Sequence, residues 1–407
     1  MQRVLVEFWR FTKESLLLVS RGSGLYVAWV ALLLLMIAAG VFGYSNQLRF
    51  GLITANVRDP VSWGFYIGNF TFLVGVAAAA VMLVIPAYVY RWGPIREVVL
   101  LGELLSVSAI IMCILFVTVD IGRPDRIWHM MPGLGTPNFP YSLLVWDVFV
   151  LSAYFVVNYF VVTYLSFMSY TGRRYNAAFI MPIIFLSIPM AISIHTVTAF
   201  LFLGLKSRPF WNDAILAPRF LASAFCSGPA LLVLIFATIR KVRPIHISDS
   251  ALQKIGELLA YAMGVNLFLL GCEVFKEFYS HSHHVIHAQF QWFGLPDGYG
   301  IAAYSWLALA CNVIAFVIFI VPALRNRIPV LLVGCVLAGS GVYVEKGLGL
   351  LLPGLTPNTL GEVYRYDPSL NEVMVGAGVW GIGFLSFTFM AKVAVAITLG
   401  EFRLRRT

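Results

Sequence analysis

The chain of 407 residues is 60% hydrophobic and only 12% charged, and its formal net charge is +9 at pH 7. Such a composition offers too little polar surface to cover a soluble globule of this size, so it predicts an integral membrane protein. The positive charge does not indicate nucleic-acid binding, because the Lys and Arg residues occur in small groups between long apolar runs. The five cysteines occur singly in apolar segments, which indicates neither a disulfide framework nor a zinc or c-type haem motif.

Ten apolar runs are long enough to cross a bilayer, because a transmembrane helix needs about 20 predominantly apolar residues. Residues 1–22 precede them and predict an interfacial helix in which aromatic and basic residues are interspersed. Ten crossings place both termini on one side, and the larger share of Lys and Arg in the connections of that side predicts that it is cytoplasmic. In chain order the runs are residues 25–46, 64–90, 97–121, 142–168, 178–204, 215–239, 254–279, 300–323, 327–347 and 374–399.

The connections on the opposite, extracytoplasmic side are predicted to carry the functional surface. They are longer than the cytoplasmic ones and rich in Pro, Gly, Trp and Tyr, which suits a binding site or a docking surface better than a minimal turn. These connections are residues 47–63, 122–141, 280–299 and 348–373. The predicted location is the cytoplasmic (inner) membrane.

Ionisable side chains within membrane spans are costly and usually face the protein interior or water. The short side chain of Asp147, within LVWDVFVL, cannot reach the membrane surface, so its burial demands a partner. The same argument favours a functional role for Asp120 and Glu273. Arg123, in IGRPDR, is open to two interpretations, one that it holds Asp120 in the charged state and one that it forms a plain surface salt bridge. Other ionisable groups near span ends are open to snorkelling or structural pairing, namely Glu257, Lys276, Glu277 and Lys392.

His195 is the only histidine well inside a span. A haem between transmembrane helices generally uses two facing axial ligands, so a single buried histidine favours hydrogen bonding to a quinone, proton transfer or structural packing instead. The later run HSHHVIH places His283 and His287 at a spacing compatible with metal binding. No acidic or Cys ligand frames that run, so a solvated loop is the preferred interpretation, and we predict no metal site.

The chain lacks nucleotide-binding, nucleophile-elbow and zinc motifs, which argues against hydrolysis or nucleotide binding. Outer-side carboxylates, one intramembrane His and aromatic span ends would suit a quinone head group, whose reduction or oxidation needs hydrogen-bond partners and nearby proton carriers. Two alternatives from other classes remain open. One is a proton-coupled secondary transporter and the other is a purely structural membrane anchor of a redox complex.

Five motifs, in order and with suitable spacing, resemble the NrfD/PsrC family of membrane quinone oxidoreductase subunits. The resemblance runs from about residue 55 through the ninth span, and within the family the ten-span layout and the segment after His195 look most like DsrP of the Dsr electron-transfer complex of sulfur-metabolising prokaryotes. The motifs are WGFYIGNFTF at 63–72, DIGRP at 120–124, LVWDVF at 144–149, SIHT at 193–196 and RPFW at 208–211.

The resemblance implies an all-α polytopic membrane protein with two consecutive four-helix bundles and two flanking spans. It implies bound menaquinone or ubiquinone as substrate, no haem or iron–sulfur cluster in this chain, and no catalysis by the chain alone. Implied partners are an extracytoplasmic ferredoxin-like iron–sulfur subunit (DsrO-like), a multihaem cytochrome c (DsrJ-like) and further DsrM-like and DsrK-like subunits. The implied segments are an interfacial segment (1–24), the first flanking span with its outer loop (25–62), the first bundle with the quinone site (63–205), the second bundle (206–350), and the outer loop with the last span and C-terminus (351–407).

Carried onto this sequence, the resemblance also implies the site residues. We expect a proton route from Asp147 inward through Glu103, with Glu257 and Glu273 as candidate proton carriers in the second bundle. The residues expected around the quinone head group are Tyr66, Asn69, Asp120, Arg123, Asp147 and His195.

Overall fold

The computed structural model describes residues 2–90, 92–96, 98–279, 284–296, 298–358 and 360–404. Within these residues the regular elements are all helical, and ten helices are long and apolar enough to cross a membrane. This confirms the predicted all-α polytopic class with ten spans. The division into two four-helix bundles, the segment boundaries and the cytoplasmic position of the termini stay predictions.

The spans follow the predicted apolar runs closely. They are α2 (Gly24–Phe50), α3 (Phe65–Ala77) continued by α4 (Ala79–Val84) and η2 (Ile85–Val89), α6 (Val99–Asp120), α7 (Leu143–Thr171), α8 (Ala177–Leu203), α9 (Leu216–Val242), α10 (Asp249–Tyr279), α12 (Ala302–Ile320), α14 (Ile328–Lys346) continued by α15 (Leu348–Leu355), and α16 (Leu370–Thr398). The smaller helices are α1 (Gln2–Val19), η1 (Leu52–Ala55), α5 (Gly93–Arg96), η3 (Pro124–Met130), α11 (Val285–Trp292) and α13 (Pro322–Arg325).

Serine caps fix the starts of two spans, and one of them begins before its predicted run. The helix α16 begins four residues before the predicted run, because the Ser369 hydroxyl accepts a bond from the Glu372 backbone N–H while the Glu372 carboxylate accepts one from the Ser369 N–H. Ser142 caps α7 in a similar way through the N–H of Val145. The second span ends in a π-helical turn that contains Pro86, a residue with no N–H for the helical ladder.

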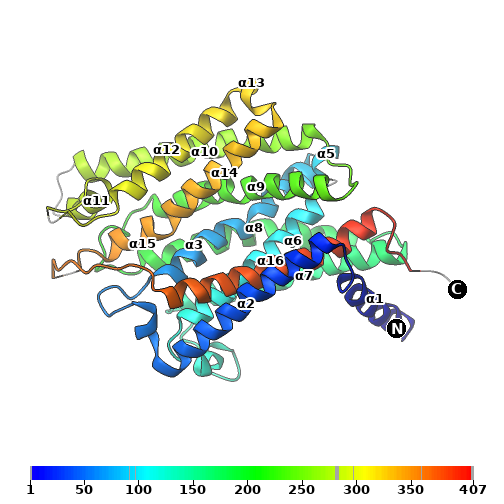
Figure 1. Ribbon diagram of the computed structural model, residues 1–407, viewed down its shortest axis with the longest axis horizontal. Coiled ribbons are helices and arrows are strands. Elements are labelled where there is room, and N and C mark those ends of the chain that lie inside the picture. Colours follow the sequence, from blue (N-terminus) through cyan, green and yellow to red (C-terminus); the bar gives the residue numbers. More distant parts are fainter. Residues whose placement is uncertain are drawn as a thin grey trace.

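The helices lie side by side, and both chain termini lie at one end of the molecule (Figure 1). We call the opposite end the long-loop end; the connections described there are residues 51–64, 121–142, 293–296, 298–301, 356–358 and 360–369. At the terminal end, α1 packs its Phe11 ring against Phe167 of α7 and Phe402. Glu7 of α1 also forms an ion pair with Arg173 at 2.7 Å. The first helix is therefore fixed to the span helices by both rings and charges.

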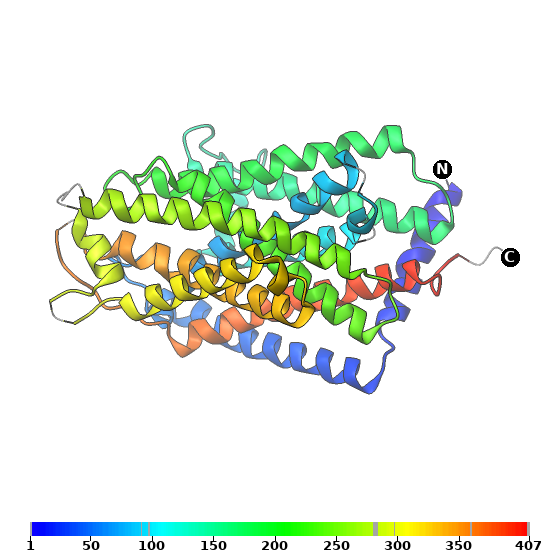
Figure 2. The same ribbon diagram turned by 90° about the horizontal axis from the view of Figure 1, so that it is seen from above.

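The first and last spans, α2 and α16, pack closely together along one edge of the molecule (Figure 2). Their backbones meet at Gly40 and Gly378, where a Cβ added to Gly40 would lie 2.5 Å from the Cα of Gly378. Small residues permit this close approach of two membrane helices, which gain stability from packing rather than from the hydrophobic effect.

The second span, α3, lies at the centre of the fold. Every residue of α3 after its first is buried, and the helix contacts α6, α8, α9, α14 and α16. Glycines allow two of these approaches, since Gly68 faces the backbone of Gly347 and Gly75 faces Ala224 and Ser227 of α9. Polar side chains on α3 therefore meet other protein groups rather than lipid.

Candidate functional site

The facing surfaces of α7 and α8 bury one carboxyl group and one imidazole near the long-loop end. Asp147 of α7 is 2% exposed, and its Oδ1 accepts a hydrogen bond of 2.7 Å from the hydroxyl of Thr198 on α8. Thr198 lies one turn after His195, and residues three apart share a helix face. Asp147 thus bonds to α8 at a point one turn from His195. Two of the predicted head-group residues therefore lie on adjoining helices.

The His195 ring has one satisfied and one unsatisfied nitrogen. Nδ1 lies 2.7 Å from the carbonyl oxygen of Ala191 one turn earlier, so Nδ1 carries the proton and donates it to that carbonyl. Nε2 is then the nitrogen with the lone pair. Within the described residues this buried Nε2 has no hydrogen-bond partner. A buried polar atom of this kind usually serves an absent ligand, a water or a reaction.

Aromatic rings continue the same face of α8 toward the long-loop end. Phe202 lies seven residues after His195 and is fully buried. Its ring centre is 5.3 Å from that of Trp63, 5.1 Å from that of Trp211 and 5.9 Å from that of Phe220 on α9. The proton-carrying groups are therefore bordered by flat apolar side chains.

Tyr66 and Asp120, two further predicted residues, belong to a second cluster on the side of α3 that faces α2. The Tyr66 hydroxyl donates a 2.8 Å hydrogen bond to Oε1 of Gln47 on α2, and the Gln47 amide donates to the Val119 carbonyl at 2.6 Å. Asp120, the last residue of α6, and Glu372 of α16 both lie near enough to interact electrostatically with Tyr66.

Glu372 is itself held by the loop before α16. Its carboxylate accepts a 2.7 Å bond from the hydroxyl of Tyr366, whose oxygen accepts in turn from the backbone N–H of Phe65 at 2.7 Å. Burial raises the pKa of Tyr366 above its usual value, so this hydroxyl remains a donor. The flanking segments thus contribute polar groups directly beside the start of α3.

Asn69 points toward a third set of partners. Its Oδ1 accepts bonds from the hydroxyl of Tyr343 on α14 at 3.0 Å and from the indole nitrogen of Trp380 on α16 at 2.8 Å. Its amide nitrogen donates to the Phe65 carbonyl at 2.8 Å. All of these bonds are internal to the protein, so Asn69 fixes α3 against α14 and α16.

Arg123 lies at the surface of the long-loop end. Its guanidinium donates two hydrogen bonds, of 3.0 and 2.9 Å, to the carboxylate of Asp125, and these bonds hold the pKa of that carboxyl below its usual range. The structure therefore favours the surface salt bridge over a contact with Asp120. The six predicted head-group residues divide into the Asp147–His195 pair, the Tyr66–Asp120 pair, and Asn69 and Arg123 with partners of their own.

Two of the predicted proton carriers lie toward the terminal end. Glu103 on α6 is 3% exposed, and its Oε2 has no hydrogen-bond partner within the described residues. Buried Tyr154, two turns after Asp147 on α7, interacts electrostatically with Glu103. Glu257, by contrast, forms an ion pair of 3.0 Å with Lys254 on the same helix, and both side chains are about one-third exposed.

The interior of residues 206–350 contains a buried ionic network that single-span patterns did not reveal. Arg219 of α9 forms ion pairs with Glu273 of α10 and, at 3.0 Å, with Glu345 of α14. The other oxygen of Glu345 accepts bonds from Asn266 at 3.3 Å and from Asn312 at 2.9 Å. The predicted proton carrier Glu273 is thus held by a permanent positive charge.

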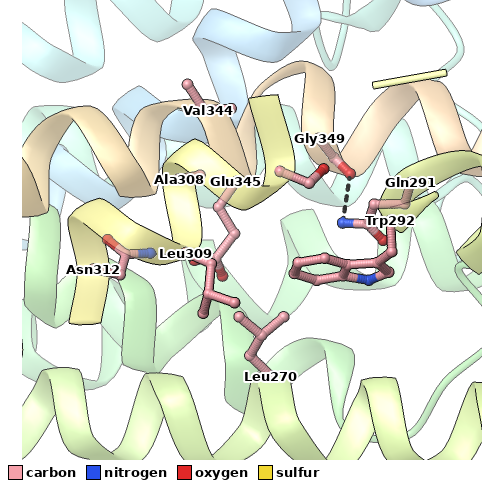
Figure 3. Close-up of a pocket in the computed structure, with 10 residues that line it drawn as sticks. Leu270, Gln291, Trp292, Ala308, Leu309, Asn312, Val344, Glu345 and Gly349 are labelled. Carbon is pink, nitrogen blue, oxygen red and sulfur yellow. Dashed lines mark hydrogen bonds between the residues drawn. The ribbon is translucent and has the colours of Figure 1, made fainter. Parts of the chain in front are cut away.

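A small cavity borders this network (Figure 3). Its volume is about 10 Å³, close to what a single water occupies. Glu345 and Asn312 lie on one side of it, and Gln291, which donates to the Gly349 carbonyl at 3.5 Å, lies on the other.

The HSHHVIH segment falls partly outside the described residues, which exclude His281 and His283. His287 is buried, and its Nδ1 donates to the carbonyl oxygens of Pro353 at 2.7 Å and Thr356 at 3.1 Å. Burial lowers the pKa of His287, so the ring is held neutral. In the described part of the chain, no group of three or more His, Cys, Asp or Glu residues is placed to hold a metal ion.

The predicted site did not include Gln47, Thr198 or Glu372, three polar residues that contact its members. Thr198 carried a usable signal, because it follows His195 at helical spacing. Glu372 also carried a signal, because Ser369-x-x-Glu372 is a capping box that places the glutamate at the helix start. For Gln47 the relevant contacts are tertiary and leave no local pattern.

Comparison with known families gives one match over most of the chain. The profile of the family described as "Polysulphide reductase, NrfD" matches residues 54–357. The matched region includes every predicted site residue and leaves out Gln47, Tyr366 and Glu372.

Curated relatives are similar along nearly their whole length. The chain is 26% identical over 396 residues to a putative dimethyl sulfoxide reductase membrane subunit of Halobacterium salinarum, and the match covers 88% of each chain. It is 22% identical to a selenate reductase subunit of Mesobacillus selenatarsenatis, over 87% of this chain and 90% of that one. It is also 22% identical to the Hdr-like menaquinol oxidoreductase integral membrane subunit of Archaeoglobus fulgidus, over 91% of this chain and 94% of that one.

Proposed function

The chain belongs to the NrfD family and is a membrane subunit of an oxidoreductase complex, and from this premise we propose that it exchanges electrons with a membrane quinone near the long-loop end of α7 and α8. The name of the Archaeoglobus relative supports menaquinol as the substrate. The chain acts together with partner subunits and not alone.

The observation that carries the proposal is the unsatisfied Nε2 of His195 beside the Asp147–Thr198 pair. Oxidation of a quinol to a quinone breaks two O–H bonds and releases two protons and two electrons. His195 Nε2 can accept a hydrogen bond, and then a proton, from one quinol hydroxyl, and Asp147 can take the proton onward. Reduction of a quinone runs the same steps in reverse. The rings around Phe202 would pack against the flat head group.

In this proposal the electrons pass between the quinone and a redox centre on a partner subunit. We propose an iron–sulfur partner of the ferredoxin-like, DsrO type that docks at the long-loop end, which would then be extracytoplasmic. The resemblance to DsrP supports a role in sulfur or sulfite metabolism, with DsrJ-like, DsrM-like and DsrK-like subunits in the same complex. Tyr154 and Glu103 extend inward from Asp147 and support a proton route toward the terminal end.

The proposal is tested with the assembled complex in membranes, by following oxidation of the soluble naphthoquinol menadiol. Asp147→Asn and His195→Gln are expected to reduce turnover by about 10²-fold, because each removes a positioned proton carrier. The matched control is Asp59→Asn, the same change at an exposed residue of the loop before α3. Normal turnover in both site variants would overturn the assignment of the site. An intact wild-type complex without any quinol response would overturn the function itself and favour a structural anchor.

A further inference from the structure

Lys346, the last residue of α14, is buried although its side chain ends in an amino group. It is 4% exposed, and none of the ion pairs among the described residues includes it. Its neighbour Glu345 accepts hydrogen bonds from Arg219 and from two asparagine amides, and it acts on Lys346 only through its charge. The nearest identified contact of Nζ is the Phe220 ring, whose centre is 3.7 Å away.

Burying a lysine side chain at this position costs free energy. Ionisable side chains within membrane spans are expensive, and a long apolar side chain would fill the same volume without that cost. The contact with Phe220 compensates only part of the cost, because the face of a phenyl ring attracts a cation weakly. The amino group therefore has bonding capacity that the described residues do not use.

The position of Lys346 connects it to the Asp147–His195 pair. The hydroxyl of Thr71 on α3 donates to the Lys346 carbonyl at 2.6 Å, which fixes the end of α14 against the central helix. Phe220, under the amino group, packs on Phe202 of α8, which lies on the same helix face as His195. Lys346 also lies near enough to His195 for its charge to act on the ring. Lys346 of α14 and Phe220 of α9 thus lie beside the aromatic rings that follow His195 on α8.

We propose that the Lys346 amino group donates a hydrogen bond to one ring oxygen of the quinone head group, while His195 and Asp147 serve the other. The inference rests on the proposed function and adds a residue from the second half of the chain to the site. No proton or electron passes through Lys346 during turnover, and the second quinol proton leaves from this ring oxygen to water at the long-loop end. The amino group stabilises negative charge that develops on the ring oxygen, as an oxyanion-stabilising donor does.

The test uses Lys346→Met in the assembled complex, with menadiol as the probe and with KM, kcat and the thermal midpoint measured together. The expected result is a decrease in kcat/KM of at least about tenfold, typical for loss of a charge-stabilising donor. The thermal midpoint should not fall, because the substitution removes a buried polar group that has no carboxylate partner. Lys346→Gln, which keeps a shorter donor, should give an intermediate kcat/KM and serves as the second variant if the Met variant does not assemble.

The matched control is Glu345→Gln, one residue earlier on the same helix. It should lower the thermal midpoint, because it weakens the bond to Arg219, and leave kcat/KM near that of the wild type. Wild-type kinetics in both Lys346 variants would overturn the inference while the response of the unmodified complex to menadiol upholds the function. A decrease in kcat/KM that only parallels a lower thermal midpoint would equally overturn it, since that pattern indicates a structural role.

Discussion

In α7 the carboxyl group of Asp147 receives a hydrogen bond from the neutral hydroxyl of Thr198, whereas in α14 the carboxylate of Glu345 receives bonds from the Arg219 guanidinium and two amides. Glu103 of α6 repeats the first pattern, since it is buried with no ion pair in the described residues. Glu273 of α10 repeats the second, since it pairs with Arg219.

The presence or absence of an arginine partner distinguishes two roles for a buried carboxyl group. A carboxylate buried without a counter-charge is costly, so such a group is suited to gain and lose a proton rather than to hold a permanent charge. A carboxylate paired with arginine keeps its charge, because the guanidinium is always protonated. We therefore expect the first half of the chain to take part in proton exchange and the second half to hold helices together.

The largest expected effect is on the stability of the second half. Arg219→Met leaves Glu273 and Glu345 buried without their cation, so we expect a loss of about 3–5 kcal/mol in the free energy of unfolding. Thermal unfolding of the assembled complex measures it. The control is the triple variant Arg219→Met, Glu273→Gln, Glu345→Gln, which should recover most of the loss because no buried charge is left unpaired. Equal losses in both variants would show that packing, not charge, holds these helices.

Glu273→Gln sharpens the comparison, because Glu273 is also a predicted proton carrier. Arg219 keeps its bond to Glu345 in this variant, so we expect a smaller loss of about 1.5–3 kcal/mol, typical of one hydrogen bond to a charged group. Menadiol turnover should stay close to that of the wild type, in contrast to Asp147→Asn. A large loss of turnover without a loss of stability would place Glu273 on a proton route and remove the contrast between the halves.

Glu103→Gln tests the proton route of the first half. The amide has nearly the same shape, so stability should change by no more than about 1 kcal/mol. Electron transfer from menadiol should continue, while proton uptake and membrane potential in liposomes should be lost, since the amide cannot carry a proton. Glu257→Gln, at the partly exposed pair with Lys254, is the control and should leave both signals intact. Unchanged proton uptake in Glu103→Gln would exclude the route through this residue.

The smallest expected effect concerns His287. Its pKa in the folded protein lies below the usual 6.5, so below that pH the unfolded chain binds more protons than the folded one. The stabilisation from the neutral, buried ring is fully present above pH 6.5 and is lost as the pH falls toward the lower folded-state value. The thermal midpoint should therefore decrease slightly on mild acidification, and His287→Asn should show a smaller decrease. An identical pH dependence in the variant would assign the effect to other groups.

The ten spans were predictable because apolar length alone decides whether a segment crosses a membrane. The start of α16 at Leu370 was missed by the predicted run from residue 374, although the capping box from Ser369 to Glu372 marks it in the sequence. The π-helical turn at the end of the second span was harder to predict, since a proline such as Pro86 is tolerated in many membrane helices.

The candidate site was predictable only in part. The burial of Asp147 and His195 follows from their place in apolar runs, and the structure puts them on facing helices. The separate partners of Tyr66, Asn69 and Arg123 did not follow, because a motif records which residues are present and not the direction in which each points. The Arg219 network joins three spans far apart in sequence, so no local period reveals it.

The contact between Gly40 and Gly378 has a consequence for assembly in the cell. Because α2 precedes α16 by eight intervening spans, α2 must wait in the membrane without its main neighbour until α16 has been inserted. Gln47 on α2 can meet Tyr66 as soon as α3 follows, whereas Glu372 reaches the start of α3 only with α16. The polar surroundings of Tyr66 are thus completed in two steps, and a chain truncated before α16 would leave them open.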